Sequence, residues 1–328
     1  MIKFLKIAGY VVLSLAVLIG AIIVYIKNAM PDVGPPENLK VELTPARIER
    51  GHYLAWSVSV CMDCHSTRDW SKFSGPIIPG KIGQGGERFD QNAGLPGAFF
   101  SRNITPEGIS RYTDGELYRV ITTGVTKEGR AMFPLMPYPY YGKMDREDIM
   151  SIIAYVRTIE PVKNDVPPSV PDFPMSVIIN TIPHPATPMP MPDPSDQLAY
   201  GEYLVNAASC VECHTPFEKG KIVQEFRFGG GREFTLPDKS VVRSANITPN
   251  ETVGIGKWSV QQFVSRFKLF ADSSYVAPSV KPGEFNTVMP WSMYSHMKED
   301  DLKAIYAYLK TVDPVDSKIS IFTAAAKP

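Results

Sequence analysis

One unit of sequence occurs twice in this chain of 328 residues, and the repeat constrains the fold more than any other feature. The first copy covers residues 44–161 and the second covers residues 196–315. Both contain, in the same order, Gly-x-Tyr-Leu, Cys-x-x-Cys-His, a glycine-rich stretch, Asn-Ile-Thr-Pro and Met-Pro followed by an aromatic residue. Because the length leaves room for about two ordinary domains, the repeat predicts two tandem domains of one fold.

Each copy carries the signals of short α-helices. Thr113 with Glu116, and Ser259 with Gln262, have the spacing of a capping box at a helix start. Each copy also ends in a segment with the i, i+3, i+4, i+7 period of an amphipathic helix. The apolar residues are Ile149, Ile152, Ile153 and Val156 in the first copy and Leu302, Ile305, Tyr306 and Leu309 in the second. The sequence therefore predicts a mainly α-helical protein.

All four cysteines lie in the two Cys-x-x-Cys-His motifs, which are Cys61-Cys64-His65 and Cys210-Cys213-His214. Cysteines at i and i+3 share one face of a helical turn, where each thiol can form a thioether to a haem vinyl group while the next histidine binds the iron. The pairs of a four-cysteine zinc site usually lie about 15–20 residues apart, and a thioredoxin-like site needs a βαβ context. Neither pattern is present, so we predict two covalently attached haem c groups.

A methionine in each copy is the expected second axial ligand. Met136 and Met289 each precede a proline and an aromatic residue, and they match each other in the repeat. Met132 and Met293 lie close by and are competitors, although they do not match each other. We therefore predict that iron is bound by His65 with Met136 and by His214 with Met289, a pairing that raises the haem potential relative to two histidines.

The remaining polar candidates have weaker support. His52, His184 and His296 have no equivalent in the other copy or lie between the copies, and we interpret them as surface or structural residues. Two base-aromatic pairs occupy one repeat position, and a base there could pair with a haem propionate or simply be solvated. These pairs are Arg111-Tyr112 and Lys257-Trp258, and the same two interpretations apply to Arg88 and Arg232. Asn103 and Asn246 are expected to fix their loops rather than to touch iron.

An uncharged apolar segment lies near the N-terminus. Residues 7–26 contain no charged side chain and are long enough to cross a bilayer core of about 30 Å as a helix. A cleaved signal peptide is the alternative, but its apolar core is normally about 7–15 residues and a small-residue cleavage site follows it. We predict an uncleaved anchor at residues 1–30. Lys3 and Lys6 precede the apolar segment and place the N-terminus in the cytoplasm, with the repeats in the bacterial periplasm.

The segments outside the two copies are irregular. Residues 162–195 form a proline-rich linker, which we expect to pack as a strap because Val177-Ile178-Ile179 is apolar, and residues 316–328 form a C-terminal tail. Lysine plus arginine and aspartate plus glutamate both number 34, so the chain has no basic excess for nucleic-acid binding.

The order of these motifs resembles the cytochrome c subunit of membrane-bound periplasmic alcohol and aldehyde dehydrogenases. Residues 113–119 (Thr-Asp-Gly-Glu-Leu-Tyr-Arg) strengthen this resemblance, which covers nearly all of residues 45–315. It implies two tandem class I cytochrome c domains with His/Met haems behind the transmembrane helix. It also implies electron transfer from a dehydrogenase towards a quinone or an oxidase. That family typically has three haem motifs, and this sequence has two.

Electron transfer is the predicted function, because two irons with both axial positions filled leave no open site for substrate chemistry. The chain is then no enzyme by itself but an electron-transfer protein or subunit. One alternative is the dihaem subunit of a terminal oxidase. Another is a dihaem peroxidase, which requires an iron with a vacant or displaceable ligand.

Overall fold

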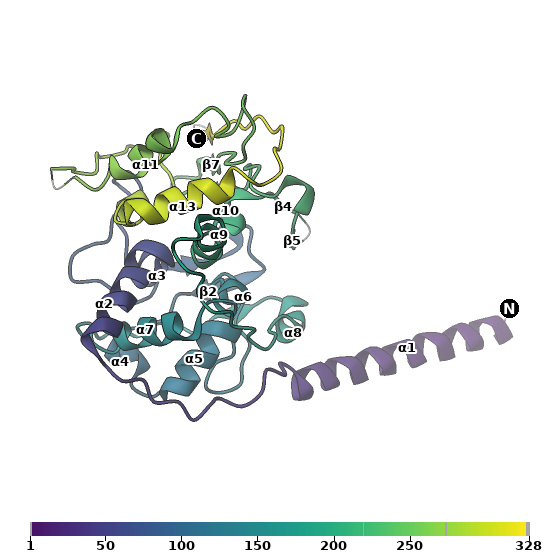
Figure 1. Ribbon diagram of the computed structural model, residues 1–328. Coiled ribbons are helices and arrows are strands. Elements are labelled where there is room, and N and C mark those ends of the chain that lie inside the picture. The colour runs from purple at the N-terminus through teal and green to yellow at the C-terminus, as the bar shows by residue number, and fades with distance from the viewer. Residues whose placement is uncertain (1, 219, 273, 326–328) are drawn as a thin grey trace.

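The computed structural model describes residues 2–218, 220–272 and 274–325. The helix α1 projects away from a body in which the second repeat copy lies on the first (Figure 1). The helices are α1 (Ile2–Ala29), α2 (Pro45–Tyr53), α3 (Cys61–Cys64), α4 (Pro106–Ile109), α5 (Asp114–Thr123), α6 (Tyr138–Tyr141), α7 (Arg146–Val156), α8 (Met175–Ile178), α9 (Gln197–Ala207), α10 (Cys210–His214), α11 (Val260–Lys268), α12 (Trp291–Tyr294) and α13 (Glu299–Leu309). This architecture confirms the predicted mainly helical class.

The helix α1 is apolar on every side and buries none of its residues. Among the described residues it is the helix with the length and composition to cross a membrane. A helix that is apolar all round and leaves the body of the protein needs an apolar medium around it. It therefore has the properties of a membrane segment, as the sequence predicts.

The first and last helices of each copy cross at very short distance. A Cβ atom at Gly51 of α2 would lie 1.8 Å from the Ser151 carbonyl oxygen of α7. A Cβ atom at Gly201 of α9 would lie 2.1 Å from the Ala304 carbonyl oxygen of α13. The glycine of each Gly-x-Tyr-Leu motif is thus required because any side chain would force the two helices apart.

The predicted helix signals are confirmed in both copies. Thr113 with Glu116, and Ser259 with Gln262, form complete capping boxes at the starts of α5 and α11. The apolar residues predicted for α7 are all buried, as are those of α13 except the half-buried Tyr306. These two helices supply much of a hydrophobic core that continues from one copy into the other.

Each copy also has a small antiparallel sheet of three strands. The strands of the first copy are β1 (Arg88–Phe89), β2 (Gly97–Phe100) and β3 (Val170–Pro171), and those of the second are β6 (Glu233–Thr235), β7 (Val241–Arg243) and β8 (Phe322–Thr323). A separate hairpin joins β4 (Phe217–Glu218) and β5 (Lys221–Ile222). The strand β3 comes from the linker and β8 from the C-terminal tail, so both segments pack against the preceding copy.

The linker is a packed strap and not a loose tether. Val177 and Ile179 are buried, whereas Ile178 between them is exposed. Its first part adds β3 to the sheet of the first copy. The apolar run in the middle of the proline-rich segment therefore holds the strap to the body of the protein, as the sequence predicts.

A reciprocal pair of hydrogen bonds joins the two copies. The Tyr203 hydroxyl of α9 donates to Asp148 Oδ2 of α7 at 2.5 Å, and the Tyr53 hydroxyl of α2 donates to Asp301 Oδ2 of α13 at 2.5 Å. Each hydroxyl also accepts a bond from the backbone N–H that precedes the other copy's last helix, at 3.2 and 3.0 Å. The tyrosine of one motif thus binds the last helix of the other copy, in both directions.

Candidate haem-attachment sites

Each Cys-x-x-Cys-His motif folds as one short helical turn. Val60 and Ser209, the residues before the two motifs, have φ values of 43° and 52°. This left-handed conformation is costly for a residue with a side chain, and its occurrence at the same place in both copies indicates a local requirement. The chain turns there so that α3 and α10 begin directly after the preceding helical segments.

The two motif histidines are oriented by backbone carbonyls. His65 Nδ1 lies 2.6 Å from the Arg102 carbonyl oxygen, and His214 Nδ1 lies 2.8 Å from the Ala245 carbonyl oxygen. A carbonyl accepts only from a protonated nitrogen, which leaves Nε2 as the free lone pair for a metal. Burial also lowers the pKa of both imidazoles and so favours the neutral form that binds iron.

The Asn-Ile-Thr-Pro loop holds the carbonyl that orients each histidine. In the first copy Asn103 Oδ1 accepts from the backbone and hydroxyl of Thr105, at 2.9 and 2.8 Å. Asn103 Nδ2 donates to the Val162 carbonyl at 2.7 Å. Asn246 makes the same three bonds in the second copy, at 2.9, 2.7 and 2.8 Å. Both asparagines are buried loop anchors, in agreement with the interpretation from the sequence.

The glycine-rich stretch closes the other side of each motif. The Gly85 backbone N–H donates to the His65 carbonyl, and the Gly230 N–H donates to the His214 carbonyl, both at 2.8 Å. Both glycines have positive φ, and a Cβ atom at either would lie 2.5 Å from the backbone of the Asn-Ile-Thr-Pro loop. The motif, the glycine-rich stretch and this loop are therefore one packed unit.

The two cysteines of the first motif line a cavity of about 1400 Å³. Residues of the first copy line most of it, including Cys61, Cys64, His65 and Met136 together with apolar side chains such as Phe99. Most small-molecule pockets have about 300–1,000 Å³, so this one has room for a large flat group. Burial raises the pKa of Cys61 to about 12, which makes it a neutral thiol. Two thiols, one oriented imidazole and an apolar lining fit a covalently bound haem.

The cavity also reaches the second motif. Cys213 lines it together with the neighbouring Glu212 and Tyr294. Glu212 is held from the first copy, because the Tyr140 hydroxyl of α6 donates to its Oε1 at 2.7 Å. The two Cys-x-x-Cys-His turns therefore face a common space across the contact between the copies.

The methionine candidates differ in their burial and in their position relative to the cavity. Met132 and Met136 both line the cavity, so Met136 stays a prediction. In the second copy Met293 is buried in the core, whereas Met289 is half-buried and packs against that core. Met144 and Met297, which also match in the repeat, are fully buried core residues.

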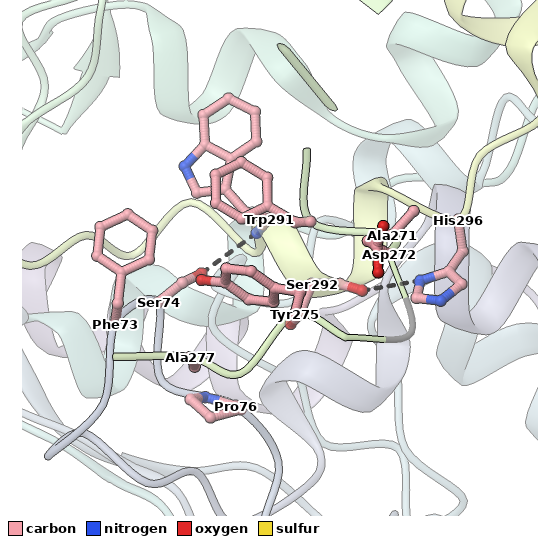
Figure 2. A pocket seen from close by; sticks show the side chains of 11 residues that line it. Phe73, Ser74, Pro76, Ala271, Asp272, Tyr275, Ala277, Trp291, Ser292 and His296 are labelled. Carbon is pink, nitrogen blue, oxygen red and sulfur yellow. Dashed lines mark hydrogen bonds between the residues drawn. The ribbon is translucent and has the colours of Figure 1, made fainter. Parts of the chain in front are cut away.

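Sequence reasoning missed a contact from the first copy to the loop of Met289. The Ser74 hydroxyl donates to the Met289 carbonyl at 2.5 Å and accepts from the Trp291 backbone N–H at 3.2 Å. Figure 2 shows Ser74 and Trp291 joined in this way at the edge of an aromatic pocket. The Ser74 backbone N–H donates to Asn286 Oδ1 at 2.8 Å, so the loop before Met289 is held twice from the other copy.

The remaining candidates differ in position. Arg111 lies over the Tyr112 ring at 5.0 Å, lines the cavity and pairs with Glu128. Arg88 and Arg232 are not equivalent, because Arg232 lies two residues after Gly230 and Arg88 lies three after Gly85. Arg88 pairs with Asp90, and Arg232 pairs with Glu212.

The three histidines outside the motifs are exposed, as expected for surface residues. They are His52, His184 and His296.

The four cysteines form no disulfide. Within the described ranges no three histidine, cysteine or carboxylate side chains are grouped to hold a bare metal ion.

Comparisons with known proteins agree with this geometry. Residues 198–313 match the cytochrome c family. The cytochrome c subunit of alcohol dehydrogenase (quinone) from Gluconacetobacter polyoxogenes is 30% identical over 82% of this chain and 57% of its own length. The gluconate 2-dehydrogenase cytochrome c subunit of Pantoea cypripedii is 26% identical over 85% of this chain and 62% of its own. A dihaem c-type cytochrome of Cereibacter sphaeroides is 25% identical over 81% of this chain and 86% of its own length.

This chain thus spans little more than half the length of the dehydrogenase subunit from Gluconacetobacter polyoxogenes. Residues 198–313 are a cytochrome c domain, which binds haem c, and the chain as a whole resembles the cytochrome c subunits of alcohol dehydrogenase (quinone) and gluconate 2-dehydrogenase.

Proposed function

We propose that this chain is a membrane-anchored dihaem cytochrome c that transfers electrons within a dehydrogenase complex. The observation that carries the proposal is the matched pair of sites, in which each motif histidine donates from Nδ1 to a loop carbonyl at 2.6 or 2.8 Å. A group held in this way supplies a reversible one-electron couple. The domains are residues 44–161 and 196–315, each with one haem.

The proposed residues fall into two equivalent sets. Thioethers form at Cys61 and Cys64 in the first domain and at Cys210 and Cys213 in the second. The axial ligands are His65 with Met136 and His214 with Met289. Support for two sites comes from the equivalent bonds around both motifs, and support for direct electron exchange comes from the cavity that Cys64 and Cys213 share.

The helix α1 is the anchor of the proposed function, with the haem domains in the periplasm. Lys3 and Lys6 lie at the start of the helix, before its uncharged stretch, which agrees with a cytoplasmic N-terminus. Anchoring confines encounters with membrane partners to two dimensions and raises the effective concentration of each partner.

The donor is a dehydrogenase, and the acceptor is a quinone or a terminal oxidase. Support for the donor comes from the relatives, which are named as cytochrome subunits of alcohol, gluconate and fructose dehydrogenases.

The haem count is tested by intact mass and pyridine-haemochrome absorbance of the purified full chain. We expect two covalent haems in the wild type and one in each double variant, Cys61→Ala/Cys64→Ala and Cys210→Ala/Cys213→Ala. A wild type with a single haem contradicts the proposal. Affinity capture from solubilised membranes then tests the partner: a dehydrogenase subunit supports the proposal, and a copper-haem oxidase without a dehydrogenase contradicts it.

A further inference from the structure

The chain between α1 and α2 is fixed to the first domain. Glu37 forms an ion pair with Arg146 at 2.5 Å, and the Val41 backbone N–H donates to Asp114 Oδ2 at 2.8 Å. Val41 itself is buried in the core. Only residues 30–36 separate α1 from the fixed segment, so the first domain stays near the end of α1.

That side is formed by the strap. The helix α8 and the turn at Ile179–Thr181 contact α1, and Figure 1 shows α8 beside the end of α1 that joins the body. Val177 and Ile179 are buried and hold this part of the strap against the domain. The residues between and before them are consequently turned away from the core.

These outward residues are strongly apolar. Phe173 is 76% exposed, Val170 is 59% exposed and Ile178 is 45% exposed. Residues 173–183 contain no charged side chain, and the exposed Asp172 borders them. An exposed aromatic ring is costly in water, and several exposed apolar side chains in one short segment mark a site of interaction.

We propose that Val170, Phe173 and Ile178 form a membrane-contact face that inserts into the bilayer interface beside α1. The occupant is lipid because α8, which carries Ile178 and follows Phe173 in the chain, contacts α1, and α1 is itself apolar on every side. Aromatic and aliphatic side chains next to a transmembrane helix bind the headgroup and acyl boundary. The face would give the haem domains a second contact with the membrane. The proposal rests on the anchor of the proposed function.

A spin label on the full chain in phospholipid nanodiscs tests this face. All native cysteines are assigned to thioethers, so Phe173→Cys provides a single thiol for a nitroxide, and unlabelled wild type verifies this. Val276→Cys is the matched control, because Val276 is 79% exposed in the second domain. We measure the access of dissolved oxygen, which concentrates in lipid, against that of a water-soluble nickel chelate.

We expect the oxygen-to-nickel accessibility ratio at position 173 to exceed that at position 276 severalfold. Equal ratios overturn the proposal. A second outcome also overturns the proposal. In it, the label at position 173 is accessible to water in nanodiscs and becomes protected only when a dehydrogenase subunit is added, because the face then binds protein. Intact mass shows whether α1 is retained, and the haem spectrum shows whether both haems are present. A failure of the anchor or of haem attachment is thus distinguished from a failure of this face.

Discussion

Tyr203 and Asp148 lie 2.5 Å apart across the contact between the two copies, and Tyr53 with Asp301 repeats this bond in the opposite direction. Both aspartates are buried, so each tyrosine hydroxyl satisfies a carboxylate that water does not reach freely. A buried carboxylate that loses a hydrogen bond is expensive, which makes this reciprocal contact a strong determinant of how the two copies are oriented.

Tyr203→Phe and Tyr53→Phe should each lower the free energy of unfolding by about 1–3 kcal/mol, because each removes a hydrogen bond to a buried charged group. Thermal or denaturant unfolding of the holoprotein measures the loss. The control is Tyr308→Phe, which removes only a 3.4 Å bond on the surface and should change little. Equal stability of all three variants and the wild type would contradict a stabilising role of the bonds between Tyr203 and Asp148 and between Tyr53 and Asp301.

Ser74→Ala should weaken the axial bond of Met289 while leaving the first haem unchanged. The variant removes the bonds from Ser74 to the Met289 carbonyl and from Trp291 to Ser74. We expect a reduced charge-transfer absorption of methionine-ligated ferric haem and a lower potential at one haem only. Redox titration with absorbance detection measures both.

Ser71→Ala is the matched control for Ser74, since the Ser71 hydroxyl bonds only to Asp69 within its own loop. If Ser74→Ala moves both potentials equally, the effect is a general loss of structure. No change in either potential means that Ser74 does not position the methionine.

Met289→His should lower the potential of the second haem and leave the first nearly unchanged, and Met136→His should do the reverse. Two histidines stabilise ferric haem more than histidine with methionine does. The shift is expected to be a fraction of the roughly 0.8 V that axial ligands can span. Redox titration again gives both values.

Met132→His distinguishes the two methionines that line the cavity. It should leave the potential of the first haem close to that of the wild type. A drop with Met132→His and none with Met136→His would transfer the axial role to Met132.

Asn246→Ala should lower the free energy of unfolding by about 1–3 kcal/mol, because it leaves the Thr248 backbone N–H and the Val315 carbonyl without their partner. Asn103→Ala should have a similar cost in the first domain. Unfolding of the holoprotein measures both, with the exposed Asn38→Ala as the control. A changed axial-ligand spectrum at unchanged stability would instead place the asparagine at the iron.

The parts of the structure that sequence predicts are those set by neighbouring residues. The capping box at Thr113 depends on Glu116, and the Cys-x-x-Cys-His turn depends on Cys61, Cys64 and His65, all within a few positions. The contact of Ser74 with Met289 joins residues 215 positions apart. It has no equivalent in the repeat and leaves no periodic pattern, so no sequence argument could find it.

The sequence did not reveal the two tyrosine–aspartate hydrogen bonds between the copies for another reason. Tyr53 and Tyr203 are visible in the sequence as matching members of Gly-x-Tyr-Leu, but a match between copies does not reveal that the partner lies in the opposite copy. Only the packing of α2 against α7 and of α9 against α13 turns both hydroxyls towards the other domain.

The strands β3 and β8 pair with β2 and β7, although both follow the last motif that the copies share. The structural unit of each copy therefore extends beyond the part of the sequence that is repeated. A recombination event that carried a copy to another gene and stopped at the end of α7 or α13 would leave its sheet with an open edge. Transplantation of either haem unit should include the stretch through Pro171 or Thr323.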